Sequence, residues 1–157
     1  MQCAVIEFAR HICDLSANST EFDLHTNDPV IYLMERWYDF RKGSIEERTE
    51  KSHKGGTMRL GAYPAILKQG TLARSLYGAK EASERHRHRY EVNPEYHSII
   101  EEKGMIFSGT SHDRRLVEFI ELPNLKFFVA TQAHPELKSR MEKPAPLFHG
   151  FVKACLD

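Results

Sequence analysis

The sequence has 157 residues, 41% of them hydrophobic, and its 22 basic side chains balance 22 acidic ones. This length suits one compact domain, and the zero net charge gives no electrostatic reason to expect binding to nucleic acid or to an anionic membrane. No apolar run approaches the roughly 18 to 20 residues of a membrane-spanning helix, and Glu7 and Arg10 near the start disfavour a signal peptide.

The first third of the chain predicts a helix, a short apolar run and a charged loop. Residues 3–13 place Val5, Phe8, Ala9 and Ile12 at helical spacing. Because this helix begins at the first residue with no cap before it, we expect the chain to begin inside a longer one. After the apolar run "PVIYLM", residues 35–56 are dense in charge and predict a mobile surface loop.

The remainder alternates between short strands and helices. Gly78 and Gly104 are expected to end two of the helices, and Pro94 to begin one. This mixture predicts the α/β class. The expected strands are residues 57–67, 83–92, 105–109, 115–122 and 126–132, and the expected helices are residues 71–78, 94–104 and 146–156.

A histidine and a carboxylate follow the apolar run "FFVATQ". His134 and Glu136 are two positions apart in "ATQAHPELKSR", a spacing that suits a general base and its orienting partner. Such groups lie at the carboxyl ends of buried strands in many α/β enzymes. The alternative is a surface turn that merely ends the strand.

The segment "ERHRHRYE" has two chemically different faces. In a strand, Arg85, Arg87 and Arg89 share one face, while His86 and His88 share the other with the following tyrosine. The guanidinium groups could bind carboxylates or phosphates, or they could form a solvated edge strand. The two histidines lack a third ligand at a convincing spacing, so a metal site is not favoured.

Two further segments are compatible with ligand binding. The glycines of "GGTMRLG" could hold an anion through backbone N–H groups, and the turn in "NSTEF" could leave Glu21 projecting. The plainer alternatives are a loop that leads into a strand and an ordinary turn.

These segments in this order resemble CTP synthase in its carboxyl-terminal glutamine amidotransferase domain. The resemblance rests on "MQCAVIEFAR", "NSTEF", "GGTMRLGAYP", "RHRHRYEVNPEY", "FSGTS", "RLVEFIELP", "FFVATQAHPELKSR" and "PLFHGFV", and it covers essentially residues 1–157 apart from the charged loop. It implies a flavodoxin-like class I amidotransferase fold that lacks its N-terminal strands and nucleophile elbow. Residues 1–157 would be the C-terminal portion of one glutaminase domain, without the synthase domain.

The resemblance also implies roles for five residues. His134 would be the general base and Glu136 its orienting carboxylate, while Gln2, Glu21 and Arg89 match residues that hold glutamine. A guanidinium suits the α-carboxylate of glutamine, and a carboxylate suits its α-ammonium group. The full-length parent would hydrolyse glutamine and use the ammonia to convert UTP to CTP. ATP and Mg²⁺ would bind its synthase domain, with no cofactor in this chain, and the parent would be a cytoplasmic homo-oligomer.

The nucleophile is expected outside the chain. In the family it is a cysteine in Gly-x-Cys-Leu-Gly-Met-Gln, whose Met-Gln matches Met1 and Gln2, so the chain alone is predicted to be inactive. Cys3 would lie about 7.5 Å along the helix and roughly 140° around it from that place, so we expect a packed, non-catalytic thiol. Cys3, Cys13 and Cys155 form no CxxC pair and suit a reducing compartment.

The chain departs from the family pattern near the base. Ala133 and Leu137 stand where phenylalanines usually flank His-Pro-Glu, Arg114 replaces a common glycine and Ala65 a frequent cysteine. Three alternatives remain: a non-catalytic split or remnant domain that binds a partner or glutamine, a stand-alone γ-glutamyl hydrolase, and, more weakly, a nucleic-acid-binding strand at "RHRHR".

Overall fold

The structure is a computed structural model that describes residues 1–33, 36–39, 43–47 and 58–156. Helices and short strands alternate along it, as the α/β prediction requires. No described helix has both the length and the apolar composition needed to cross a bilayer. The elements are α1 (Gln2–His11), β1 (Ala17–Ser19), β2 (Asp28–Leu33), β3 (Arg36–Asp39), β4 (Ser44–Glu47), β5 (Arg59–Leu67), α2 (Leu72–Tyr77), β6 (Glu81–His88), β7 (Tyr90–Val92), the 3₁₀ turn η2 (Pro94–Tyr96), α3 (His97–Glu102), β8 (Ile106–Thr110), β9 (Val117–Glu121), β10 (Val129–Thr131), the 3₁₀ turn η3 (Pro135–Leu137) and α4 (Pro146–Leu156).

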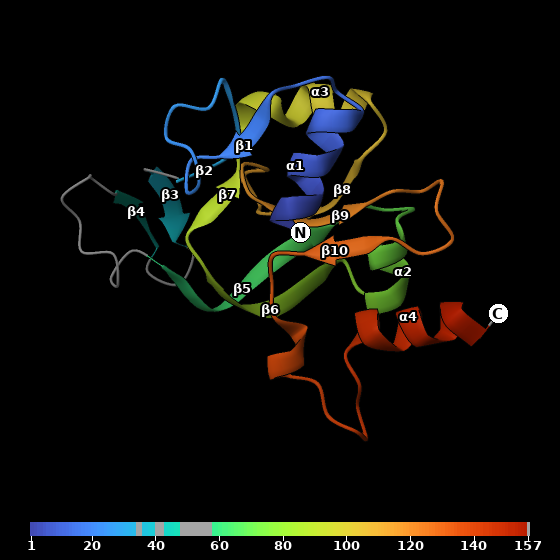
Figure 1. The fold of residues 1–157 in the computed structure, drawn as a ribbon. Coiled ribbons are helices and arrows are strands. Elements are labelled where there is room, and N and C mark those ends of the chain that lie inside the picture. The colour runs from blue at the N-terminus through green and yellow to red at the C-terminus, as the bar shows by residue number, and fades with distance from the viewer. Residues whose placement is uncertain (34–35, 40–42, 48–57, 157) are drawn as a thin grey trace.

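Two sheets form the centre of the molecule (Figure 1). The larger has the order β10-β9-β8-β5-β6, and every neighbouring pair in it is antiparallel. The smaller has the order β1-β2-β7, with β1 parallel and β7 antiparallel to β2. Strands β3 and β4 form a separate antiparallel pair.

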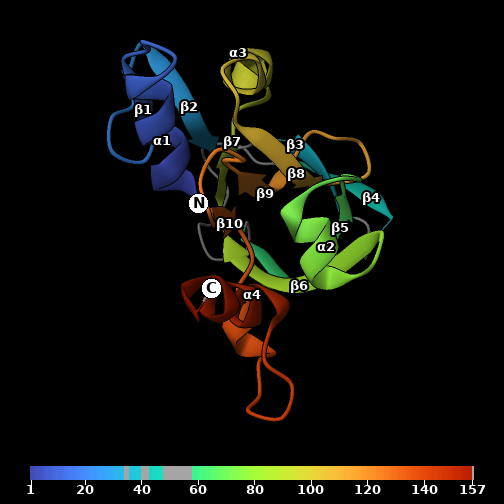
Figure 2. The same cartoon turned by 90° about the vertical axis from the view of Figure 1, so that its right-hand side faces the viewer.

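The core lies on both faces of the larger sheet. One cluster packs α1 and α3 against β8 and β9, and it includes Val5, Ile100 and Ile120. The other packs α2 and α4 against the opposite face, where Phe119 is buried. Ile120 and Phe119 belong to different clusters because successive side chains of a strand point to opposite faces. Figure 2 shows α1 and α4 well separated, with the sheet between them.

Local chemistry explains the helix ends that the sequence predicted. Thr71 caps α2 by accepting a hydrogen bond from the backbone N–H of Arg74 at 3.3 Å, and Gly78 ends it in the left-handed conformation with φ 62°. Asn93 accepts a hydrogen bond from the backbone N–H of Glu95 at the start of η2. Gly104, with φ 106°, follows α3, so its predicted role as a stop is confirmed.

Four sequence predictions need correction. The expected helix 94–104 divides into η2 and α3, and the expected strand 83–92 breaks at Arg89 into β6 and β7, which pair with different sheets. Part of the expected loop 35–56 is the β3–β4 pair; residues 48–56 lie outside the described part. Cys3 is exposed rather than packed. It lies about 110° around α1 from the centre of the buried Val5, Ile6 and Ala9 face.

Candidate functional site

His134 and Glu136 form a hydrogen-bonded pair at the surface. The Nδ1 atom of His134 lies 2.7 Å from Oε1 of Glu136, and the histidine side chain is 34% exposed. A carboxylate only accepts hydrogen bonds, so it selects the tautomer in which Nδ1 carries the proton and Nε2 keeps its lone pair. This arrangement makes His134 able to accept a proton at Nε2.

The electrostatics of the pair favour an ionised Glu136. Desolvation acts to raise the pKa of this carboxyl, but the His134 hydrogen bond, a backbone N–H and the nearby charge of Arg87 outweigh it and hold the pKa below its usual range. Glu136 therefore stays an acceptor at neutral pH and continues to orient the imidazole.

Backbone contacts hold this segment against two strands. The N–H of Gln132 donates to the carbonyl of Glu118 in β9 at 3.0 Å, and the N–H of His134 donates to the carbonyl of Arg85 in β6 at 2.8 Å. Pro135 then begins η3, where its missing N–H costs no hydrogen bond. The strand β10 that precedes the segment is half-buried. Two backbone hydrogen bonds, one to β9 and one to β6, thus hold the base in position.

Of the other predicted site residues, Gln2 lies close to Arg89 in the fold, and Glu21 lies apart from them. Gln2 approaches the β6–β7 junction, because its Nε2 donates to the carbonyl of Tyr90 at 2.7 Å, next to Arg89. Gln2 also donates to Oε1 of Gln132, which lies two positions before His134. Glu21 lies in an exposed turn after β1. Among the described residues, no hydrogen bond joins the side chain of Glu21 to the other four predicted residues.

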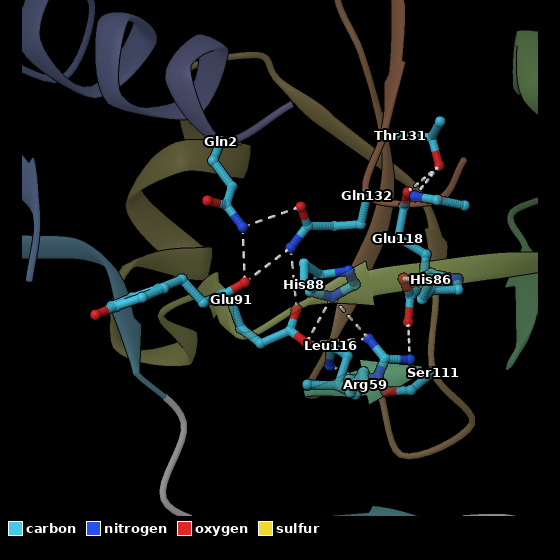
Figure 3. A network of polar contacts seen from close by, with 12 residues as sticks. Gln2, Arg59, His86, His88, Glu91, Ser111, Leu116, Glu118, Thr131 and Gln132 are labelled. Atoms are coloured by element: carbon cyan, nitrogen blue, oxygen red, sulfur yellow. Dashed lines mark hydrogen bonds and ion pairs between the residues drawn. The ribbon is translucent and has the colours of Figure 1, made fainter. Parts of the chain in front are cut away.

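A buried charged cluster lies beside Gln132 (Figure 3). Arg59 of β5 is its centre, with Nη1 3.0 Å from Oε1 of Glu91 and Nη2 2.7 Å from Oε1 of Glu118. Glu91 also accepts from Nε2 of His88 at 2.9 Å and from Nε2 of Gln132 at 3.1 Å. Because Glu91 lies on β7 and Arg59 on β5, the cluster joins the smaller sheet to the larger one.

The two carboxyl groups of this cluster differ in their proton affinity. Burial acts to raise the pKa of Glu91, but His88 and Arg59 together hold it well below its usual range. Burial raises the pKa of Glu118, and Arg59 offsets that rise only in part. Oε2 of Glu118 faces Nδ1 of His86 at 3.5 Å. Burial lowers the pKa of His86 to about 2, so this imidazole is neutral at physiological pH.

The β6 faces agree with the sequence prediction. His86 and His88 lie on the inward face and Arg85 and Arg87 are exposed, and β6 is an edge strand of the larger sheet. The solvated-edge alternative therefore fits Arg85 and Arg87 best. Among the described residues, no group of three or more His, Cys, Asp or Glu side chains is arranged to hold a metal ion. The glycines of "GGTMRLG" at 55 and 56 lie outside the described residues.

The residues on either side of His134 border a largely apolar hollow. Ala133 and Pro135 line a hollow of about 460 Å³ between β10 and α4, together with Phe128 and Phe148. Phe127 and Phe151 also line it and contact each other edge to face. Aromatic side chains from the approach to β10 and from α4 thus line this hollow, while Leu137 is exposed. A second hollow of about 500 Å³, beside α3, contains none of the predicted site residues.

Gln132 and the Arg59–Glu91–Glu118 cluster were not among the residues predicted from the sequence. Only one signal was available: Glu118 stands in "LVEFIE", and a carboxylate inside an apolar strand needs a partner. Its partner Arg59 is 59 positions away, a distance over which no local pattern operates.

In the described part of the chain, no hydrogen bond joins a cysteine to His134. Cys3 and Cys155 are exposed, and Cys13 is buried with its pKa raised by that burial. A thiol with a raised pKa is a poor nucleophile, since the thiolate is the reactive form.

Comparison with known proteins gives a consistent result. The model of the family "Glutamine amidotransferase class-I" matches residues 1–154. The CTP synthase of Methanococcus maripaludis is 62% identical over 157 residues, and that of Methanocaldococcus jannaschii is 60% identical over 157 residues. The matches cover 100% and 99% of this chain but 27% of each relative, so the chain spans about a quarter of their length.

A solved structure supports the same assignment. The glutaminase domain of Trypanosoma brucei CTPS, with bound acivicin, superposes with a TM-score of 0.82 at 33% identity. The superposition covers 98% of this chain and 56% of that one. The predicted α/β amidotransferase fold is thus confirmed, and the chain belongs to the class-I glutamine amidotransferase family.

Proposed function

We propose that residues 1–157 are part of the glutaminase domain of a CTP synthase, which releases ammonia from glutamine for the ATP-dependent amination of UTP. The observation that supports this most directly is the 2.7 Å contact between Nδ1 of His134 and Glu136. It leaves Nε2 free to act as a base, and the 62% identical relative is a CTP synthase.

The proposed reaction needs a thiolate, which the family resemblance places before Met1. The thiol proton passes to Nε2 of His134, and the sulfur attacks the amide carbon of glutamine. The carbon–nitrogen bond then breaks, and ammonia leaves with the proton returned from Nε2. The glutamyl thioester that remains is hydrolysed by water, which breaks the carbon–sulfur bond, gives glutamate and returns a proton to the thiol. Glutamate release and ammonia transfer complete the cycle.

Gln2, Glu21 and Arg89 are proposed to hold the substrate, as the resemblance implies. The position of Gln2 beside the Arg89–Tyr90 junction supports a shared site for two of them. With this function we propose that the synthase domain binds ATP and Mg²⁺, and that the parent self-associates and works in the cytoplasm.

The test uses the full-length protein that contains these residues. His134→Ala is expected to reduce glutamine hydrolysis and glutamine-dependent CTP formation by roughly 10²- to 10⁴-fold, the usual contribution of a general base. CTP formation from added ammonia should be unchanged. His149→Ala, at an exposed position of α4, is the matched control and should behave as the unmodified protein.

Each alternative gives a different result. Glutamine hydrolysis without CTP formation would favour a γ-glutamyl hydrolase. Glutamine binding without hydrolysis in the unmodified protein would favour a non-catalytic remnant. The genomic sequence upstream of the Met1 codon adds an independent check, because the proposal requires an in-frame Gly-x-Cys-Leu-Gly there.

A further inference from the structure

An ordered series of hydrogen bonds runs from α1 to the buried cluster. Nε2 of Gln2 lies 3.2 Å from Oε1 of Gln132, and Nε2 of Gln132 lies 3.1 Å from Oε2 of Glu91. The carbonyl of Tyr90 accepts from both amides, at 2.7 Å from Gln2 and 3.2 Å from Gln132. Figure 3 shows the two amides placed end to end beside Glu91. No other described side chain connects α1 to the cluster in this way.

The acid at the end of this series fixes the direction of both amides. Glu91 is 2% exposed and bonded to Arg59 and His88, so it is ionised and accepts hydrogen bonds only. Gln132 must therefore present its NH₂ group to Glu91, which turns its Oε1 toward Gln2. Gln2 must in turn present its NH₂ group to Oε1 of Gln132 and to the carbonyl of Tyr90. A reversed Gln2 would place its own oxygen against two other oxygens.

This arrangement determines where the carbonyl oxygen of Gln2, Oε1, is directed. Its NH₂ group is occupied by two acceptors, and its Oε1 makes no hydrogen bond with any described residue. In Figure 3 this oxygen points away from Gln132. Gln2 is half-buried on α1, and the two hydrogen bonds of its NH₂ group fix the direction in which this oxygen accepts.

We propose that Gln132 is a positioning residue that fixes Gln2 so that its carbonyl oxygen faces the bound glutamine and selects a ligand with an N–H donor there. The inference rests on the proposed function and extends it, because it states which atom of Gln2 meets the substrate. Glutamine offers two such donors, its α-ammonium group and its side-chain amide.

The experiment combines protein and ligand changes in the full-length protein. Gln132→Met removes all three hydrogen bonds of the Gln132 amide at similar volume, and Gln2→Met removes the acceptor itself. Each is assayed for kcat/KM with L-glutamine, with L-glutamate γ-methyl ester, which lacks the amide N–H, and with 4-carbamoylbutanoate, which lacks the α-ammonium group. Gln69→Met, exposed beside the other hollow, is the matched control.

We expect Gln132→Met to lower kcat/KM for glutamine roughly three- to tenfold, the effect of one hydrogen bond, mainly through KM. One of the two analogues lacks the N–H donor that binds Oε1 of Gln2. With that analogue, Gln132→Met and the unmodified protein should have the same kcat/KM, because the hydrogen bond that the substitution weakens is already absent. Gln2→Met should show the same ligand dependence, and that analogue identifies the donor. Ammonia-dependent CTP formation should stay unchanged in all variants.

Two results would overturn the inference. One is an equal loss with all three ligands in Gln132→Met, which indicates a general structural role. The other is no loss in Gln132→Met while Gln2→Met is impaired, which means that Gln2 holds its orientation without Gln132. Failure of the proposed function looks different: the unmodified protein itself would not hydrolyse glutamine.

Discussion

Removal of the Arg59 side chain should destabilise the protein more than removal of any exposed charged side chain. Arg59 is 4% exposed, and its partners Glu91 and Glu118 are 2% and 0% exposed. Arg59→Met keeps most of the volume but leaves two carboxyl groups buried together without a cation. Loss of one partner of a buried ion pair typically costs about 3–5 kcal/mol.

Proton uptake limits this loss. A carboxyl with an ordinary pKa near 4.3 takes up a proton at pH 7 at a cost of about 3 to 4 kcal/mol, since each pH unit corresponds to about 1.4 kcal/mol. In Arg59→Met, burial without the cation should raise the pKa of Glu91 and raise further the pKa of Glu118, which burial already holds above its usual value. Stability from such a group is present at low pH and is lost as pH rises. The deficit should therefore shrink by about 2 kcal/mol between pH 7 and pH 5.5.

Hydrogen exchange measured by mass spectrometry on the full-length protein is the suitable assay, because it reports the opening free energy of individual segments. Peptides that cover β5 and β9 should lose protection in Arg59→Met. Arg115→Met, at an exposed position, is the control and should stay within about 0.5 kcal/mol of the unmodified protein. Unchanged protection in Arg59→Met, or a deficit that grows as pH falls, would refute the reasoning.

Two further predictions concern other buried polar groups. Glu121 accepts from the backbone N–H groups of Leu72 and Ala73 at 2.8 and 2.7 Å, so Glu121→Gln should destabilise α2 by about 1–3 kcal/mol in the same exchange assay. An equal effect of Glu142→Gln, at an exposed position, would contradict this. His86 has its pKa lowered to about 2, first by burial and then by Arg59. Below pH ~6.5 the unfolded chain takes up a proton on this histidine and the folded protein does not. The free energy of unfolding therefore falls on acidification by up to about 1.4 kcal/mol per pH unit. His86→Gln should therefore show a shallower acid loss than the unmodified protein in thermal unfolding between pH 7 and 5; parallel pH curves would exclude the assignment.

The features that could be predicted from the sequence are those that depend on interactions between residues close together in the chain. The caps at Thr71 and Gly78 and the spacing of His134 and Glu136 act within a few residues, so the sequence predicted the ends of α2 and the pair at the site. The break at Arg89 was not predictable, because the alternation of arginine with histidine or tyrosine continues through residues 85–90 and only pairing with two different sheets reveals the break. The contact of Gln2 with Gln132 joins positions 130 apart and depends on the whole fold.

The charged cluster also limits how related sequences can be recombined. Arg59, Glu91 and Glu118 come from three separate strands, yet each depends on the others for its charge balance. A chimaera with a crossover between residues 59 and 118 would take these partners from two parents. Wherever the parents differ at one of these positions, such a chimaera would inherit an unmatched buried charge. Crossovers in the exposed segment 140–144 would leave the whole cluster within one parent.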